Sequence, residues 1–165
     1  MIELQDGPLY KFSEWPNDQV PRLAAGVYTV WREDELLYAG MSGRAMKQEQ
    51  LVATPGQARA AVGLWTRLKA HASGRRSGDQ FSVYVCDRFV VPVLAPHQQA
   101  EIGHGRLSLD QLTRDYIHEH LGYRFLICRD GAEASEIERA VRAGSLKAGL
   151  PYLNPLKAKA AARID

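Results

Sequence analysis

The chain has 165 residues, of which 45% are hydrophobic and 24% charged, and its formal net charge is +2. This composition excludes a disordered chain, and the length suffices for one domain with a hydrophobic core that needs no disulfide. No apolar run is long enough to span a bilayer, and no charged-then-apolar signal opens the sequence. We therefore expect a cytoplasmic protein that makes no membrane contact.

The two cysteines, Cys86 and Cys128, lie far apart, each in an apolar run. Their separation lacks the spacing of a zinc site, and cytoplasmic proteins rarely keep disulfides. We expect two buried free thiols that pack as small hydrophobic side chains.

The sequence predicts a single domain over 1–165, with an N-terminal arm over 1–25, a core over 26–154 and a basic tail over 155–165. Pro8, Pro16 and Pro21 favour an irregular arm with one short strand. After the arm, 26–31 and 36–40 are rich in β-formers and flank the polar residues 32–35. This pattern is typical of a β-hairpin.

The segment 42–56 predicts a loop with one helical turn. Leu64, Trp65, Leu68 and Ala72 form one stripe of a helix over 58–72, which Ser73-Gly74 ends. The alternating, branched residues of 81–91 predict a strand that ends at Pro92.

Ser108 and Gln111 form a capping box, which predicts a helix that ends near Gly122 with Leu109, Leu112 and Tyr116 facing inward. A strand over 123–128, a helix over 132–143 and a turn at 151–155 follow. The order hairpin, helix, strand, helix, strand, helix predicts an α+β fold, a small antiparallel-rich sheet flanked by helices.

Gly26-Val27-Tyr28 and Tyr38-Ala39-Gly40 resemble the paired motif that names the GIY-YIG nucleases. Three further matches follow in the order of that family: Arg67 and His71 four apart on a predicted helix, Glu138 on a later helix, and Asn154 before Pro155. The resemblance covers 26–154, with Ala39 in place of isoleucine or valine. The segments 45–63 and 88–122 look like insertions.

The resemblance implies an endonuclease that hydrolyses DNA with one Mg²⁺ (or Mn²⁺) ion per active site. It implies that Tyr28 is the general base, assisted by Tyr38, and that Glu138 rather than Glu136 holds the metal. Arg67 would stabilise the charge of the transition state, and His71 would assist Tyr28. Gly26, Gly40 and Asn154 would support the site. Because a phenol has a reference pKa of about 10, we expect Arg67, His71 and the metal to lower the pKa of Tyr28.

The positive charges point to a nucleic-acid partner. Most of the 21 Lys and Arg residues lie in 44–76 and 139–163. If both segments share one face, they attract phosphates, and we expect Arg44, Lys69, Arg75 and Arg76 to contact the DNA backbone. Solvated helix faces are the alternative explanation.

Two other functions fit the same residues: a nucleic-acid-binding module that has lost catalysis, and a nuclease directed at RNA. A restriction-type enzyme that cuts both strands would need two active sites and hence a homodimer. The histidines at positions 97, 104, 118 and 120 are interpreted as surface residues rather than a metal cluster.

The hairpin allows a geometric prediction. Successive side chains of a strand point to opposite faces, so Tyr28 and Tyr38 share a face only in an even register, with Tyr28 opposite Tyr38. A loop of the four residues 32–35 would put the two phenols on opposite faces. We therefore predict an odd-length loop or a β-bulge, with both phenols on the face that meets Arg67.

Overall fold

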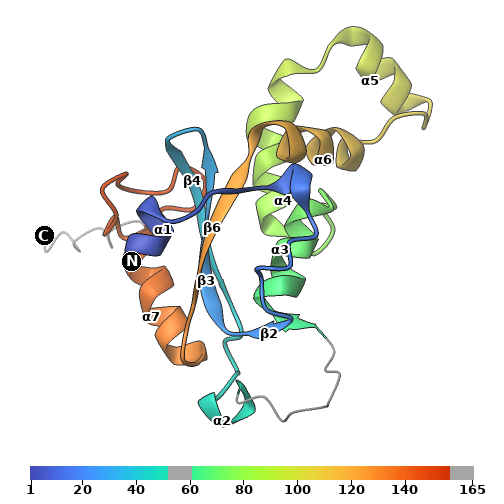
Figure 1. Ribbon diagram of the computed structural model, residues 1–165. Coiled ribbons are helices and arrows are strands. Elements are labelled where there is room, and N and C mark those ends of the chain that lie inside the picture. Colours follow the sequence, from blue (N-terminus) through green and yellow to red (C-terminus); the bar gives the residue numbers. More distant parts are fainter. Residues whose placement is uncertain (52–60, 157–165) are drawn as a thin grey trace, which may run out of the picture.

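The computed structural model describes residues 1–51 and 61–156, and it has an α+β fold built on a small antiparallel sheet (Figure 1). The sheet has the strand order β1-β6-β3-β4, with all neighbours antiparallel. Its strands are β1 (Tyr10–Lys11), β3 (Gly26–Arg32), β4 (Glu35–Ser42) and β6 (Gly122–Ile127). Two short parallel strands, β2 (Leu23–Ala24) and β5 (Val62–Gly63), pair separately. The expected fold class is confirmed at this level.

Helices lie on both sides of the sheet, with α1 and α7 on one side and α3, α4 and α6 on the other (Figure 1). The α-helices are α1 (Ile2–Asp6), α2 (Gln48–Leu51), α3 (Leu64–Ala72), α4 (Gln80–Val85), α5 (Pro96–Gly103), α6 (Leu109–His120) and α7 (Gly131–Arg142). Shorter turns are η1 (Phe12–Glu14), the π-helical η2 (Cys86–Val90) and η3 (Val91–Val93). No helix among the described residues is long and apolar enough to cross a membrane.

Strand β3 is buried on both faces, which explains why its sequence is almost continuously apolar. Tyr28 and Val30 belong to the core under α3 and α4. Val27 and Trp31 point the other way and pack with Ala134 of α7. The period of two along the strand thus divides the molecule into two hydrophobic cores.

The predicted irregularity of the hairpin is present as a β-bulge. Arg32 pairs with Glu35 and Trp31 with Leu36, but the register then shifts, so that Val30 pairs with Tyr38 and Tyr28 with Gly40. The shift brings Tyr38 to the face of Tyr28, as predicted. The expectation that Tyr28 lies directly opposite Tyr38 was wrong, because the two rings are diagonal neighbours.

The C-terminal segment covers the outer edge of β4. Tyr152 and Leu153 donate backbone hydrogen bonds to the carbonyls of Leu36 (3.0 Å) and Leu37 (2.8 Å). The Asn154 side chain accepts from the amide of Ala39 at 3.1 Å and donates to its carbonyl at 2.7 Å. A side-chain amide thus replaces a neighbouring strand, which is why an asparagine stands at this position.

The predicted strand over 81–91 was wrong, because these residues form α4 and η2. Phe81 and Val85 are buried four positions apart, as are Cys86 and Val90. This four-residue spacing fits a helix that packs on the sheet, and packing outweighs the β-propensity of the branched residues. Cys86 and Cys128 are free and buried, as expected.

Three further expectations need correction. The helix predicted over 58–72 begins at Leu64, after strand β5, and residues 58–60 lie outside the described part of the chain. The arm is more ordered than predicted, since it holds α1, β1, η1 and β2. In α6 the buried residues are Thr113 and Ile117. Leu109, Leu112 and Tyr116, which were expected to face inward, are only half-buried, and Tyr116 stacks on Phe89 of η2.

Replacing Asn154 with alanine should lower the free energy of unfolding by about 1–3 kcal/mol, because both backbone groups of Ala39 lose their partner. Urea denaturation followed by circular dichroism measures the loss. Gln99→Ala, which removes one exposed hydrogen bond to the Leu94 carbonyl, is the matched control and should change stability by less than about 0.5 kcal/mol. Equal losses in the two variants would contradict a role for Asn154 in closing the edge.

Candidate active site

The two tyrosines of the paired motif lie side by side on the sheet. Tyr28 comes from β3 and Tyr38 from β4, and their ring centroids are 6.3 Å apart. Tyr28 is only 1% exposed, whereas Tyr38 is half-buried. The bulge therefore places one buried and one accessible phenol on the face that α3 covers.

Both motif glycines are required by close contacts. Gly40 lies opposite Tyr28 in the sheet, and a Cβ atom at this position would overlap the Tyr28 ring and hydroxyl. A Cβ atom on Gly26 would overlap the Leu126 carbonyl oxygen. Gly40 thus leaves the space that the Tyr28 ring occupies, and Gly26 lets β3 and β6 approach each other.

A buried chain of hydrogen bonds runs from Tyr28 through His71 to Asp79. The Tyr28 hydroxyl lies 2.7 Å from His71 Nε2, and His71 Nδ1 lies 2.7 Å from Asp79 Oδ2. Ser82 donates a further bond to the same carboxylate oxygen at 2.9 Å. All four side chains are buried, so the sheet, α3 and α4 are joined by one polar network.

The protonation of Asp79 sets the direction of this chain. Burial alone would raise the pKa of Asp79, but the hydrogen bonds from His71 and Ser82 outweigh burial and hold the pKa below its usual value. An ionised Asp79 accepts from His71 Nδ1–H, and the tautomer with its single proton on Nδ1 presents an unprotonated Nε2 that accepts from the Tyr28 hydroxyl. One lone pair of the Tyr28 oxygen is then left to accept a proton from outside.

The expected lowering of the Tyr28 pKa by Arg67 is outweighed by burial. Burial raises its pKa well above the ordinary value, and the charges of Asp79 and Glu138 add to the increase. Arg67 lowers the pKa but does not compensate. Burial likewise raises the pKa of Tyr38 to about 12. Tyr28 is therefore a neutral phenol that donates to His71, not a phenolate.

Charged side chains from both helical layers affect the pKa values of the two phenols. Arg67, exposed on α3, is close enough to lower the pKa values of Tyr28, Tyr38 and Asp79. Glu138 and Arg142 of α7 both act on Tyr38. Arg67 of α3 and Glu138 of α7 thus lie on helices that cover opposite faces of the sheet, and both act on the two phenols. The predicted residues Tyr28, Tyr38, Arg67, His71 and Glu138 thus come together.

Glu138 fits a magnesium ion that keeps most of its water ligands. Its side chain is 14% exposed, and one carboxylate oxygen accepts from Arg142 at 3.0 Å. Within 1–51 and 61–156 no group of three or more His, Cys, Asp or Glu side chains could hold a metal ion. Magnesium can be held by one or two carboxylates together with water, whereas zinc needs more protein ligands. Glu136, the competing carboxylate, is exposed on the same helix.

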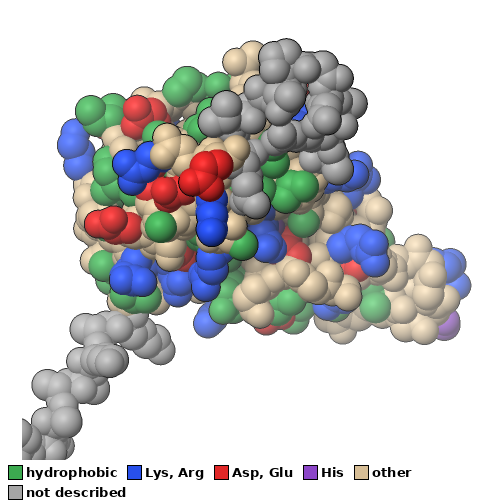
Figure 2. All heavy atoms as spheres, turned by 90° about the horizontal axis from the view of Figure 1, so that it is seen from below, with side chains coloured by type: hydrophobic (Ala, Val, Ile, Leu, Met, Phe, Trp, Pro, Cys, Tyr) green, Lys and Arg blue, Asp and Glu red, His purple; other side chains and the backbone are tan. Residues whose placement is uncertain are grey.

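The expected DNA-binding residues differ in exposure and in whether an acidic side chain pairs with them. Arg44, Lys69 and Arg75 are exposed, but the Arg76 side chain is paired with Asp110 at 2.7 Å. Figure 2 shows Lys and Arg side chains interspersed with acidic ones on the face that it views. The basic residues at positions 59, 157, 159 and 163 lie outside the described residues, so a face shared by both basic segments stays a prediction.

The sequence reasoning missed three residues of this site: Asp79, Ser82 and Arg142. Asp79 precedes residues 81–91, whose alternation predicts a strand, so the sequence does not place Asp79 at the start of a helix near His71. The available signal was the four-residue spacing of Phe81 and Val85. Arg142 follows Glu138 by four positions on the same helix, a spacing that predicts an ion pair.

No protein-family model, no curated protein and no solved structure matches this chain significantly. The functional argument therefore depends on the geometry of the chain itself.

Replacing Asp79 with asparagine should lower the free energy of unfolding by about 1.5–3 kcal/mol at neutral pH, because hydrogen bonds to a buried charge are lost. Since folding lowers the pKa of Asp79, its stabilising effect is present above the unfolded pKa of about 3.9 and is lost as the pH falls through the folded value. The difference between wild type and variant should therefore shrink below about pH 4. Urea denaturation at both pH values measures it.

Asp110→Asn, which breaks the half-exposed pair with Arg76, is the control for loss of a carboxylate. It should cost less than about 1 kcal/mol at neutral pH. If Asp79→Asn costs no more than Asp110→Asn, the buried carboxylate does not stabilise the hydrogen-bonded chain.

Proposed function

We propose that this chain is a GIY-YIG-type endonuclease that hydrolyses phosphodiester bonds of DNA with the help of magnesium. The observation that carries the proposal is the buried chain Tyr28–His71–Asp79, which lies beside Arg67 and Glu138. A proton acceptor, a cation and a carboxylate that suits magnesium are the groups that such hydrolysis needs. The two buried, free cysteines fit a cytoplasmic enzyme.

In this proposal Tyr28 takes a proton from the attacking water and passes its own proton to His71. Both transfers follow hydrogen bonds, because the Tyr28 hydroxyl donates to His71 Nε2 and keeps a lone pair for the water. Asp79 stabilises the imidazolium that results. The high pKa of Tyr28 is then compatible with its role, because free phenolate never has to accumulate. Since Tyr28 is 1% exposed, the water has to reach the hydroxyl from the side of Arg67 and Glu138.

Arg67 and Glu138 carry the remaining roles. The planar guanidinium of Arg67 can bind two phosphate oxygens and stabilise the charge that develops on them. Magnesium held by Glu138 would supply further positive charge at the phosphate and the leaving oxygen. Arg142 orients the Glu138 carboxylate through its 3.0 Å hydrogen bond. It is itself held by the Asn154 carbonyl, which accepts from Arg142 Nε at 3.0 Å.

The other candidates for the function differ in what they require. A binding module that had lost catalysis would need no buried proton relay, whose desolvation is costly. RNA as the substrate uses the same chemistry. Cutting both strands of DNA at one position would require two copies of the chain.

Incubation of the purified protein with supercoiled plasmid and magnesium should produce nicked or linear DNA. Glu138→Gln should abolish cutting at low magnesium, whereas Glu136→Gln on the same helix should leave the rate within about twofold, because its exposed carboxylate faces solvent. The rates at which supercoiled plasmid disappears, measured on agarose gels, show which of the two glutamates is needed for cutting. No cutting of plasmid by the wild type, with cutting of structured RNA, would transfer the activity to RNA, and no cutting of either would favour the binding module.

The two tyrosines should contribute unequally. Tyr28→Phe should lower the single-turnover cutting rate by about 10²-fold or more, and His71→Ala similarly, because each interrupts the proton path. Tyr38→Phe should cost less than about tenfold. Magnesium affinity, measured by calorimetry, should stay the same in all three variants. A larger loss in Tyr38→Phe than in Tyr28→Phe would assign the base to Tyr38, and weaker magnesium binding in His71→Ala would make His71 a metal ligand.

A further inference from the structure

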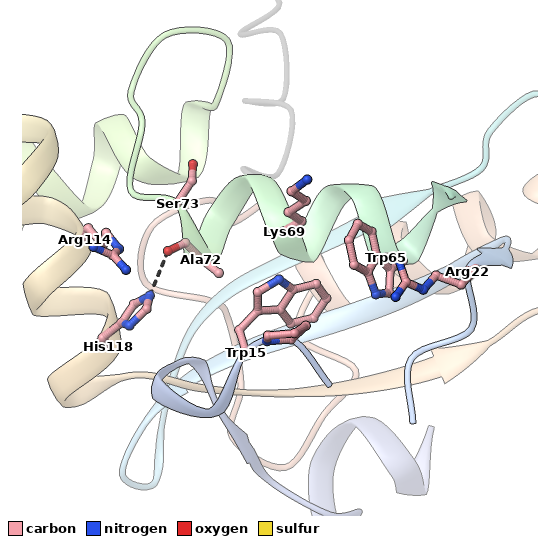
Figure 3. A pocket seen from close by; sticks show the side chains of 9 residues that line it. Trp15, Arg22, Trp65, Lys69, Ala72, Ser73, Arg114 and His118 are labelled. Atoms are coloured by element: carbon pink, nitrogen blue, oxygen red, sulfur yellow. Dashed lines mark hydrogen bonds between the residues drawn. The ribbon is translucent and has the colours of Figure 1, made fainter. Parts of the chain in front are cut away.

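Helix α3 borders a second feature on its other side, a cavity of about 510 Å³. Its walls come from three parts of the chain that are distant in sequence. Trp15 stands in the N-terminal segment, Trp65 and Lys69 on α3, and Arg114 and His118 on α6, with Arg22 at one end (Figure 3). The His118 ring donates to the Ala72 carbonyl at 2.8 Å and so joins α6 to α3 at the cavity wall. We call this cavity the tryptophan pocket.

Two indole rings form the apolar part of the tryptophan pocket. The ring centroids of Trp15 and Trp65 are 5.4 Å apart, with an angle of 49° between the planes. Trp65 is 9% exposed, whereas Trp15 is half-buried and touches Tyr123 with its edge. Trp15 is therefore an accessible aromatic surface held in place by its neighbours.

Three cations line the tryptophan pocket without an acidic partner. The Arg22 guanidinium lies 4.2 Å from the centroid of the Trp65 ring, and the Lys69 ammonium lies 5.3 Å from it. Arg114 points toward the same pocket from α6 (Figure 3). In the described part of the chain no salt bridge is formed by any of the three, and no acidic residue lines the pocket. Uncompensated cations along one pocket attract anionic groups.

We propose that the tryptophan pocket binds an unpaired nucleotide of the nucleic-acid substrate, with the base stacked on Trp15 and the phosphates of the strand attracted to the cations along the pocket. Aromatic side chains beside positive charge are the recurring chemistry of single-strand binding. The cavity has the size of pockets that enclose small organic ligands. A base inside a duplex offers no free face, so the pocket selects unpaired strands. This inference rests on the proposed function and specifies its substrate.

The position of the pocket on α3 connects it to the candidate active site. Residues turn by about 100° per position in an α-helix, so Trp65, Lys69 and Ala72 lie on one side and Arg67 and His71 on the other. Lys69 also lines a neighbouring hollow of about 380 Å³, together with Arg75 and Asp79. Asp79 accepts a hydrogen bond from His71. The positive side chains of Lys69 and Arg75 therefore lie between the tryptophan pocket and the last residue of the Tyr28–His71–Asp79 chain. A strand whose base occupies the pocket can follow Lys69 and Arg75.

Tryptophan fluorescence provides a direct test, because stacking of a base on an indole quenches its emission. The chain has three tryptophans, and the third, Trp31, is buried in the opposite core and acts as an internal reference. The whole protein is titrated with a short single-stranded oligothymidylate in EDTA, so that no cutting occurs. We expect saturable quenching, and labelled oligonucleotide in fluorescence anisotropy should give the same Kd.

Variants localise the binding. Trp15→Leu and Arg114→Ala should each raise the Kd for the single strand, Trp15→Leu by roughly tenfold or more. Arg88→Ala, which removes an exposed arginine from η2, is the control and should stay within about twofold. Because Trp15 contacts Trp65 and Tyr123, circular dichroism checks the fold of Trp15→Leu. Arg114 is exposed, so its variant keeps the test valid if Trp15→Leu does not fold.

Several results would overturn the inference. An unchanged Kd in Arg114→Ala together with Trp15→Leu would place binding elsewhere. Blunt duplex or polyglutamate that binds as tightly as the single strand would reduce the pocket to an unspecific anion surface, and thymidine monophosphate that binds equally well would indicate a free nucleotide. Glu138→Gln should bind the oligonucleotide like the wild type. If the wild type binds the oligonucleotide but cuts no substrate, the proposed nuclease function is refuted and the pocket is not. If the wild type cuts DNA while Trp15→Leu and Arg114→Ala bind the oligonucleotide with wild-type affinity, the pocket alone is refuted.

Discussion

The hydrogen bond between the Tyr28 hydroxyl and His71 Nε2 is the contact around which the rest of the structure is arranged. It joins the central strand of the sheet to α3 inside the core, where both side chains are buried. The bond requires a ring that lies flat over β4, and the ring fits only because Gly40 has no side chain. It also requires His71 to keep Nε2 free, which Asp79 ensures by accepting from Nδ1.

Asp79 shows what this arrangement costs the fold. An aspartate directly before a helix usually caps the helix by accepting from its first amides. Asp79 occupies that position before α4 but makes no such bond, because its carboxylate accepts from His71 and Ser82. Every buried polar side-chain atom of the described residues has a hydrogen-bond partner. This complete network fixes the orientation of the His71 ring, as a proton relay requires. Apolar residues in its place would stabilise the fold at least as well, because no charge would have to be buried.

The sequence predicted those parts of the molecule that depend on short-range rules. The even register demanded by Tyr28 and Tyr38 led to the bulge, and capping and periodicity located α6, β6 and α7 to within a few residues. It failed where tertiary packing decides. The residues around Phe81 have the composition of a strand, and the packing of Phe81 against Phe12, Tyr38 and His71 favours the helix instead. Since Asp79 reaches His71 only through that helix, the error in α4 concealed the third member of the relay.

Helix α3 explains why the two inferred sites are related. Its core-facing residues Leu64 and Leu68 are fully buried and separate a side that carries Arg67 and His71 from a side that carries Trp65 and Lys69. Any shift of the helix along its axis would therefore move both sites together. In the proposed binding mode, a nucleotide that fills the tryptophan pocket would contact α3 and the N-terminal segment at once and so restrict the helix that holds His71. Binding energy from an unpaired base, remote from the phosphate that is cut, can thus help to hold the relay in its reactive geometry.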